Sequence, residues 1–327
     1  MFAMIINETG GPEVMRLGEI ATPEPGPSEV CIRVAYAGVN PADWKNREGY
    51  LAAFRPYTFP YIIGFDAAGV VDKLGEGVED FAVGDHVFTP TNHGQGGLGS
   101  YAEFVIAATD RVARIPAGID FAQAAALPVA ALTAWQGVME RADIRAGQRA
   151  LIHGGAGGVG GFAVQFARLA GAHVAATCSS TNADYLRELG VERVIDYRSE
   201  DIAAAVAAWA PDGLDYLMDA VGASTLPNGL ELVHRGGTYV SVPTLNDDGD
   251  IPAALAAAAA RGVQRVFSTM NDIGSRAALE RIAGLVASGE LRLPPLREYA
   301  LRDAPEAHRS IQSGHGRGKI VLKVADV

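Results

Sequence analysis

Apolar and polar positions along this chain follow two different patterns. Up to about residue 120, short apolar or alternating runs are separated by turn residues, such as the Pro-Glu-Pro-Gly-Pro stretch at 23–27. The runs cover Glu29 to Ala37, Gly69 to Leu74, His86 to Thr89 and Tyr101 to Ile106. Short strands between turn signals are typical of a small β-barrel. The first part of the chain is therefore predicted to be a barrel-like, all-β domain.

From about residue 121, apolar strands alternate with amphipathic helices. The strands end near His153, Thr177, Ile195, Asp219 and Val242, and Val266 to Ser268 is a candidate sixth strand. This alternation predicts an α/β domain with a doubly wound parallel sheet. The sixth strand would lie at the sheet edge, with unpaired backbone groups that a second copy of the chain could cover. We therefore expect a homodimer.

The last segment has no place in that parallel sheet. A long amphipathic helix after Gly274 runs through Ala287, and a second helix is predicted around Pro305 to Gln312. A final strand, Lys319 to Val324, follows. We expect this tail to return to the first domain, so that residues 1–121 and 270–327 form one domain and 122–269 the other.

The stretch from Leu151 to Gly161 passes from a strand through a glycine turn into a helix. Three of its glycines have the spacing G-x-G-x-x-G, in which they allow a tight turn, close approach to a pyrophosphate, and helix packing. An ordinary tight turn is the alternative, but the strand, helix and following strand in register favour a dinucleotide site. The backbone of this site would comprise Gly155, Ala156, Gly157, Gly158, Val159 and Gly160.

The loop after the second strand bears on which dinucleotide binds. A carboxylate there would hold the ribose 2′-hydroxyl of NAD. This chain has Cys178-Ser179-Ser180-Thr181-Asn182 instead, and the first acidic residue is Asp184. Hydroxyl donors favour the 2′-phosphate of NADP(H), although no Arg or Lys stands in this loop. The predicted contacts are Ser179 and Ser180, with Tyr197 and Arg198 from the next loop.

Composition limits the partners and the compartment. The chain has 327 residues, 49% of them hydrophobic, which suits two globular domains. Its formal net charge is −11 with no basic block, so binding to nucleic acid or to a membrane is not expected and a small-molecule substrate is. Cys31 and Cys178 are far apart and form no disulfide framework or zinc pattern. Without a secretion signal or a membrane-length apolar run, a cytoplasmic location is predicted.

Several longer motifs occur in a fixed order along essentially the whole chain. They lie at residues 37–49, 64–87, 125–134, 155–160, 219–222 and 318–322. Together they resemble the zinc-independent quinone oxidoreductase branch of the medium-chain dehydrogenase/reductase superfamily, which contains zeta-crystallin-like quinone reductases and plant enone reductases. The resemblance implies a GroES-like β-barrel catalytic domain and a Rossmann domain with a doubly wound parallel sheet.

The resemblance also indicates that no metal is bound. The superfamily's zinc alcohol dehydrogenases have a cysteine ligand in the loop occupied here by Asn40-Pro41, and Gly-His-Glu where this chain has Gly64-Phe65-Asp66. A lone aspartate does not make a tetrahedral zinc site, and the four-cysteine lobe is missing as well. Without a Lewis acid, the natural reaction is hydride transfer to an activated acceptor, a quinone or an α,β-unsaturated carbonyl.

In the resembling enzymes the acceptor lies near the loop that begins at Asn40. Asn40 either donates a hydrogen bond to the acceptor carbonyl or forms a turn before a proline. Asp43 either orients Lys45 or Arg47 or simply starts a helix. Many quinone reductases have tyrosine where Lys45 stands, and this difference favours an enone as the substrate. Lys45 would then be a hydrogen-bond donor or the proton source; the alternative is a solvated lysine with no catalytic role. Tyr50 is a weaker candidate for the acid.

Further cofactor contacts are implied by the resemblance and by position at strand ends. Thr133 approaches the nicotinamide or the phosphates in the family, or else bonds its own helix backbone. Val221, Gly222 and Val242 follow strands at the edge where such sheets bind ligands. Arg317 and Lys319 belong to a basic segment of the returning tail. Two other functions remain open: an enoyl-thioester reductase, and a nucleotide-binding protein with little turnover.

Overall fold

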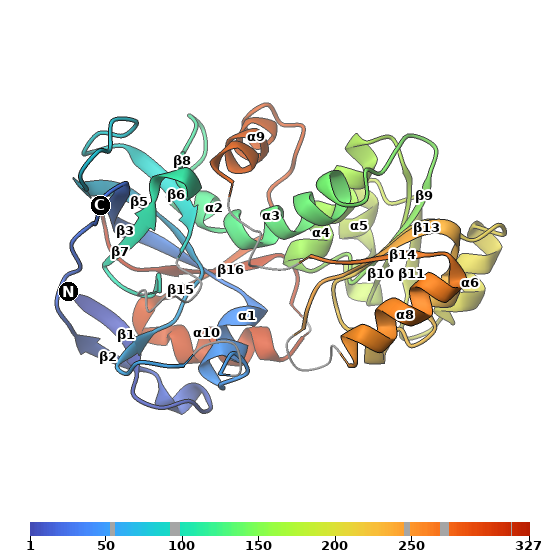
Figure 1. The fold of residues 1–327 in the computed structure, drawn as a ribbon, viewed down its shortest axis with the longest axis horizontal. Coiled ribbons are helices and arrows are strands. Elements are labelled where there is room, and N and C mark those ends of the chain that lie inside the picture. Colours follow the sequence, from blue (N-terminus) through green and yellow to red (C-terminus); the bar gives the residue numbers. More distant parts are fainter. Residues whose placement is uncertain (53–55, 92–98, 245–248, 269–274, 315) are drawn as a thin grey trace. The chain divides into compact units, whose positions relative to one another are not determined.

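The computed structural model describes residues 1–327 except 53–55, 92–98, 245–248, 269–274 and 315. The chain forms two compact units, residues 1–132 with 273–327 and residues 133–272 (Figure 1). Both boundaries lie C-terminal to the predicted ones at 121 and 269. Helix α2 (Phe121–Ala125) packs on β3 (Glu29–Val39) and β5 (Asp66–Leu74), and this short helix therefore joins the barrel.

The first unit is built from two sheets, which are antiparallel except for the parallel pair β15 and β16. The larger has the order β15-β16-β3-β5-β6-β8, and β7 pairs with β3. Its other strands are β6 (His86–Pro90), β7 (Phe104–Ala108), β8 (Ala113–Arg114), β15 (Leu296–Ala300) and β16 (Lys319–Lys323). The smaller sheet, β2-β1-β4, comprises β1 (Phe2–Ile6), β2 (Arg16–Glu19) and β4 (Tyr61–Ile62). Strand β7 begins later than predicted, because Ala102 makes only an isolated bridge to Ala3.

The C-terminal tail belongs to the first unit, as its pattern predicted. Strand β16 pairs antiparallel with β3, with Ile320 opposite Val39. Before it come α9 (Arg276–Ala287), β15 and α10 (Ala304–Gln312). Helix α9 begins at Arg276, with Ser275 as its N-cap, and ends at Ala287, as predicted. Figure 1 shows β16 beside β3, although nearly 300 residues separate them.

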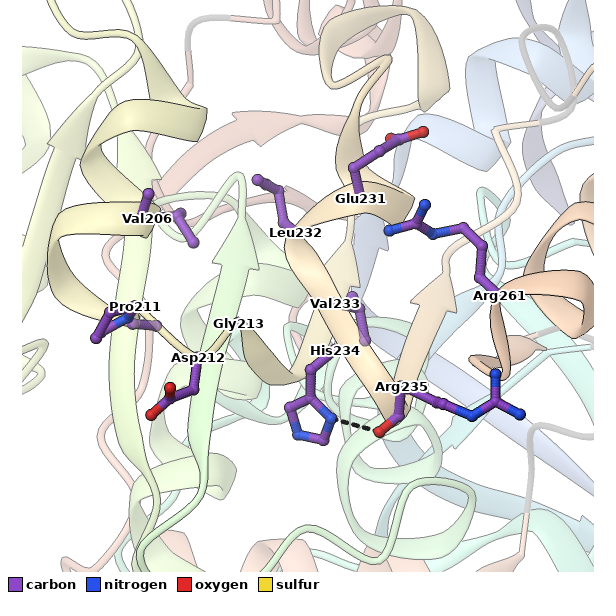
Figure 2. Close-up of a pocket in the computed structure, with 12 residues that line it drawn as sticks. Val206, Pro211, Asp212, Gly213, Glu231, Leu232, Val233, His234, Arg235 and Arg261 are labelled. Carbon is purple, nitrogen blue, oxygen red and sulfur yellow. Dashed lines mark hydrogen bonds between the residues drawn. The ribbon is translucent and has the colours of Figure 1, made fainter.

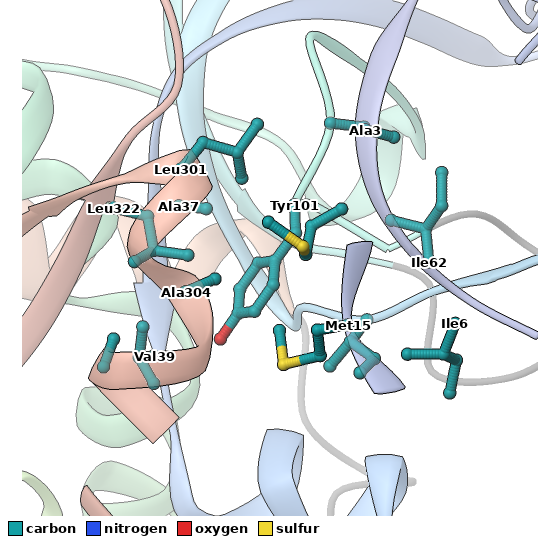
Figure 3. Packing of buried hydrophobic residues seen from close by; sticks show 14 of the residues in the cluster. Ala3, Ile6, Met15, Ala37, Val39, Ile62, Tyr101, Leu301, Ala304 and Leu322 are labelled. Atoms are coloured by element: carbon teal, nitrogen blue, oxygen red, sulfur yellow. The ribbon is translucent and has the colours of Figure 1, made fainter. Parts of the chain in front are cut away.

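One hydrophobic cluster of this unit lies between the small sheet, β16 and α10 (Figure 3). Ile62, Leu301 and Leu322 pack there around the ring of Tyr101, all of them buried. Burial of each large aliphatic side chain stabilises the fold by about 1.5–3 kcal/mol. The phenol oxygen of Tyr101 lies on the side of Val39 and Ala304, and it forms hydrogen bonds with Asp43 and His308.

The second unit contains a six-stranded parallel sheet of order β11-β10-β9-β12-β13-β14. Its strands are β9 (Arg149–His153), β10 (His173–Cys178), β11 (Arg193–Asp196), β12 (Leu214–Asp219), β13 (Val233–Ser241) and β14 (Gln264–Phe267). This is the predicted doubly wound sheet, with the sixth strand at its edge. The remaining helices of the chain are α1 (Pro41–Arg47), α3 (Pro128–Trp135), α4 (Gly158–Leu169), α5 (Ala183–Glu188), α6 (Ile202–Trp209), α7 (Gly229–Leu232) and α8 (Ile251–Arg261).

Helices cover both faces of this sheet. Leu151, Ala175 and Leu217, from three adjacent strands, pack in one cluster with α6 and α8. Helix α4 packs against β9 and β10. Because side chains alternate along a strand, a sheet covered on both sides needs apolar residues at nearly every position. That requirement explains the continuous apolar runs seen in the sequence.

Candidate active site

The glycine turn connects β9 to α4 and leaves the start of the helix uncapped. Gly157 is the N-cap residue, and it has no side chain to cap the first turn. The first intrahelical hydrogen bond is donated by Gly161 to the Gly157 carbonyl at 2.9 Å. The N–H groups of Gly158, Val159 and Gly160 precede it, at the positive end of the helix dipole. Such a terminus fits the pyrophosphate of a dinucleotide.

Each glycine of the motif meets a different environment. A Cβ at Gly155 would lie 2.8 Å from the Cβ of Ala176, and one at Gly160 would overlap the Gly154 carbonyl oxygen. At Gly157 the nearest atom, the same oxygen, would be 3.5 Å away, an ordinary contact. The first and third glycines are therefore required by packing within the protein. The middle one has room, and its missing side chain leaves space for a ligand.

The loops predicted to hold the adenosine ribose lie side by side. The backbone N–H of Tyr197, after β11, donates to the carbonyl of Cys178, the last residue of β10, at 3.2 Å. Ser179 follows directly, and Arg198 is exposed, with its guanidinium 5.7 Å from the Tyr197 ring. Asp196 is the nearby carboxylate, but its oxygens accept from its own turn, including the Arg198 N–H. These loops thus present hydroxyls and a guanidinium.

Sequence reasoning missed a buried histidine beneath the turn. The Thr225 hydroxyl donates to the Gly222 carbonyl (2.7 Å), so it accepts from Nε2 of His153 (2.9 Å). The Thr177 hydroxyl accepts from the Gly154 N–H (2.9 Å) and donates to His153 Nδ1 (2.8 Å). His153 is neutral in this chain, and its burial lowers its pKa accordingly. It thereby connects the glycine turn to the loop at Gly222.

The other predicted cofactor residues of this unit lie at strand ends or in α3. The N–H groups of Val221 and Gly222 both donate to Asp219 Oδ1 at 2.9 Å, and the N–H of Val242 donates to the Asp219 carbonyl. Asp219 thus orders both the loop that begins at Val221 and the chain at Val242. Thr133 is buried in α3, and its carbonyl accepts the Ser268 hydroxyl at 3.1 Å. Whether Thr133 contacts a cofactor stays a prediction.

The second unit also contains a pocket of about 500 Å³, whose lining residues are drawn in Figure 2. It is lined by Gly213, which precedes β12, and by Val233, His234 and Arg235 at the start of β13. The glycine turn follows the carboxyl end of β9, which is parallel to β12. The pocket therefore lies at the amino-terminal ends of the parallel strands, whereas the glycine turn lies at their carboxyl ends.

In the first unit, three buried polar side chains converge from adjacent strands. The Lys319 ammonium donates to Asn40 Oδ1 at 2.6 Å and to Asp66 Oδ2 and the Val39 carbonyl, each at 3.2 Å. Asn40 Nδ2 donates to Asp66 Oδ2 at 2.8 Å. The other carboxylate oxygen accepts the N–H of Val129 in the first turn of α3 at 2.8 Å. This cluster surrounds the predicted acceptor-binding residue Asn40.

Asp43 has the helix-start role that the sequence offered as an alternative. Its Oδ2 accepts the backbone N–H of Asn40 at 2.6 Å and the Tyr101 hydroxyl at 3.3 Å. Oδ1 has no partner among the residues that the structure describes. Burial in this site raises the pKa of Asp43 to about 8. Asp43 thus bonds the residue that precedes α1 and the Tyr101 hydroxyl.

Arg47 instead anchors a second buried chain of hydrogen bonds. Its guanidinium donates to the Gly10 carbonyl (2.9 Å) and to His308 Nδ1 (2.9 Å). His308 Nε2 therefore carries the proton and donates to the Tyr101 oxygen (3.1 Å), which in turn donates to Asp43. Burial, with the neighbouring Arg47 charge, lowers the pKa of His308 to about 3, which keeps it neutral. These bonds hold α1 against α10.

The remaining catalytic candidates lie at the outer side of α1. The Lys45 ammonium stands 5.3 Å from the ring centroid of Trp44, which makes an edge contact with Tyr50 at 6.1 Å. Tyr50 is exposed, as is Arg317 in the tail. Lys45 and Tyr50 therefore share one patch. Lys319, which was predicted with Arg317 as a cofactor contact, is buried beside Asn40.

Phe65 occupies the position at which the zinc enzymes have a histidine ligand. Its side chain is buried, and its carbonyl accepts the N–H of Thr91 at 2.9 Å. Across the described part of the chain, no group of three or more His, Cys, Asp or Glu side chains could hold a metal ion.

Comparison with known proteins identifies the family. The model of an alcohol dehydrogenase GroES-like domain matches residues 26–117, and that of a zinc-binding dehydrogenase matches 189–322. A chloroplast envelope quinone oxidoreductase homolog of Arabidopsis thaliana is 33% identical, over 99% of this chain and 98% of the relative. This chain belongs to the quinone oxidoreductase family. The family lies within the medium-chain dehydrogenases/reductases, as the sequence motifs indicated.

Two more quinone oxidoreductase relatives bear on fold and cofactor. The NADPH-dependent alkenal/one oxidoreductase of Arabidopsis thaliana is 30% identical, over 98% of this chain and 79% of the relative. The Escherichia coli quinone oxidoreductase, whose structure is a complex with NADPH, is 27% identical with a TM-score of 0.88, covering 99% of this chain and 100% of that one. These likenesses confirm the GroES-like barrel and the Rossmann-like sheet. The family is nicotinamide-dependent.

Proposed function

We propose that this quinone oxidoreductase family member transfers a hydride from NADPH to a quinone or an α,β-unsaturated carbonyl without using zinc. The observation that carries the proposal is the buried cluster of Asn40, Asp66 and Lys319 in the first unit, since Asn40 stands in the loop where the zinc enzymes have a cysteine ligand. A nicotinamide supplies the hydride when it is bound. The protein then has to meet the negative charge that develops on the acceptor oxygen, which an amide N–H can do.

Three side chains divide this task in our proposal. Asn40 donates to the acceptor oxygen, while Lys45 or Tyr50, in their common patch, supplies the proton that completes reduction. The uncapped helix start at Gly157 and the loops that carry Ser179 and Arg198 support the binding of NADPH. The names of the relatives, which include quinone and alkenal/one oxidoreductases, support both acceptor classes.

The test is a steady-state screen of NADPH oxidation over quinones, alkenals, cyclic enones and enoyl thioesters, each with and without a zinc chelator. Turnover should be fastest with a quinone or an enone and unchanged by the chelator. Preference for the thioester would favour an enoyl-thioester reductase. Tight NADPH binding without reduction of any acceptor would leave a nucleotide-binding protein. Activity lost to the chelator and restored by zinc would overturn the metal-free mechanism.

Cofactor preference gives a separate prediction. Ser179 is half-buried at the end of β10, where a carboxylate would hold a ribose diol and repel a 2′-phosphate. Ser179→Asp should weaken NADPH binding at least about tenfold and leave NADH binding equal or tighter, since tenfold corresponds to only about 1.4 kcal/mol. Fluorescence titration measures both, with Ser313→Asp in the other unit as control. Equal affinities of the wild type for the two cofactors would contradict the preference.

The edge strand β14 supports a homodimer. It pairs with β13 on one side, and among the described strands it has no neighbour on the other. Its unpaired backbone groups suit pairing with the same strand of a second copy, because such an edge otherwise promotes non-specific association. Light scattering at micromolar concentration should therefore give twice the mass of one chain. A monomeric mass would refute the dimer.

A reducing, cytoplasmic location is part of the proposal. Both cysteines, Cys31 and Cys178, are buried free thiols, and burial raises the pKa of each to about 11. Such thiols are unreactive and need no oxidising compartment. Among the described residues, no helix has the length and apolar character needed to cross a bilayer.

A further inference from the structure

The contacts of Lys319 are not explained by the role at the cofactor that the sequence predicted. It is the first residue of β16, and the pairing of Ile320 with Val39 sets it across from Asn40. Asp66 begins β5 on the other side of β3. Lys319 is 5% exposed, and Asp66 is completely buried. Three adjacent strands thus bring an ammonium, an amide and a carboxylate together at one end of the sheet.

Hydrogen-bond chemistry fixes the orientation of the Asn40 amide in this cluster. An ammonium can only donate, so the group facing Lys319 Nζ at 2.6 Å is the carbonyl oxygen of the amide. A carboxylate can only accept, so the group facing Asp66 at 2.8 Å is the amide nitrogen. Of the two hydrogens on that nitrogen, one bonds Asp66, and the second N–H is left to donate to a further acceptor.

The ammonium sits in a cradle of three oxygens, those of the Val39 carbonyl, the Asn40 amide and the Asp66 carboxylate. The three oxygens resemble the ligands of a bound cation, and the Lys319 ammonium occupies the position of that cation. Gly38 leaves room for the Asp66 side chain of this cradle, because a Cβ there would lie 2.8 Å from Asp66 Oδ2 and would overlap the Ala125 carbonyl oxygen. Burying the Lys319 charge is costly unless its partners are close and complete, as they are here.

We propose that Lys319 is a positioning residue for hydride transfer, whose ammonium holds the Asn40 amide so that its second N–H is presented to the acceptor oxygen. The proposal rests on the reductase function proposed above. A donor that is already oriented needs no rearrangement when negative charge develops on the acceptor, which is why preorganised donors stabilise transition states strongly. Lys319 contributes by fixing Asn40 and touches neither acceptor nor cofactor.

The first test compares Lys319→Met with Lys323→Met. Lys323 lies on the same strand with an exposed ammonium paired to Asp326, which makes it a matched control. Lys319→Met should lower kcat and kcat/KM by at least about tenfold, a part of the 10²–10³ attributed to one oxyanion donor. The dissociation constant of NADPH should stay unchanged. Weakened NADPH binding with wild-type kcat would overturn the proposal and return Lys319 to the cofactor site.

Chemical rescue separates positioning from folding. Lys319→Ala leaves the three-oxygen cradle without its cation, and ammonium or methylammonium chloride should restore kcat several-fold. Sodium chloride at equal ionic strength supplies no N–H donor for Asn40 and should not. Rescue by both salts alike, or by neither in a variant whose melting temperature matches the wild type, would overturn the proposal.

A readout without turnover keeps this proposal distinct from the reductase function. With selective ¹⁵N labelling of asparagine, the Asn40 side-chain amide signal, assigned through Asn40→Leu, should exchange slowly with solvent in the wild type. It should exchange faster in Lys319→Met and remain slow in Lys323→Met. An unchanged exchange rate of the Asn40 amide in Lys319→Met would overturn the positioning role. If none of the screened acceptors supported NADPH oxidation by the wild type, the reductase function alone would be refuted.

Discussion

Replacing Asn40 by leucine should lower kcat on an enone by about 10²–10³, the loss expected for one donor to a developing oxyanion. Leucine has nearly the shape of asparagine but no N–H. The melting temperature should fall, because the Lys319 ammonium loses one of its three oxygens. The fold should still form, because Lys319 and Asp66 face one another at 3.2 Å and Asp43 accepts the backbone N–H of residue 40. Steady-state kinetics with NADPH and a cyclic enone measures the effect, and NADPH binding should not change.

The controls for this experiment identify which group meets the charge. Asn7→Leu, at an exposed asparagine of the same unit, should leave kcat unaltered. Lys45→Ala should lower kcat at least about tenfold if its ammonium delivers the proton, again without weakening NADPH binding. A wild-type rate for Asn40→Leu together with a large loss for Lys45→Ala would transfer the oxyanion role to Lys45.

The sequence predicted those parts of the site that depend on local pattern. The turn from Gly155 to Gly160 lies between a strand and a helix whose periodicities are visible in about twenty residues. The helix start at Asn40 was also within reach, since Pro41 and Asp43 are favoured in a first turn. The return of the tail followed from a strand that lacked a place in the parallel sheet.

What could not be predicted depends on register between distant strands. Lys319 meets Asn40 because Ile320 pairs with Val39, and a shift of one residue would turn its side chain to the other face. No local sequence pattern predicts the register between these two strands. The bond between Arg47 and His308 is of the same kind, since it requires α10 to pack on α1. His153 was overlooked because its partners are distant in the sequence: Thr177 lies in strand β10, and Thr225 lies in the segment after β12.

Gly157→Ala should raise the dissociation constant of NADPH at least about tenfold, or about 1.4 kcal/mol, without lowering the melting temperature. The backbone of Gly157 has φ −74° and ψ 173°, which alanine adopts without strain. An added methyl group would meet no protein atom closer than 3.5 Å, so the fold accepts it. It would occupy the space through which a pyrophosphate approaches the helix N-terminus. Fluorescence titration and thermal unfolding measure the two quantities.

Two other glycines make this experiment decisive. Gly160→Ala places its methyl group against the Gly154 carbonyl oxygen, so it should lower the melting temperature as well as the affinity. Gly284→Ala, inside α9 with no atom within 4 Å of the added methyl group, should change neither affinity nor fold, apart from a slight gain in helix stability. If Gly157→Ala bound NADPH as tightly as Gly284→Ala does, the cofactor would not approach this turn, and the dinucleotide site would have to lie elsewhere on the sheet.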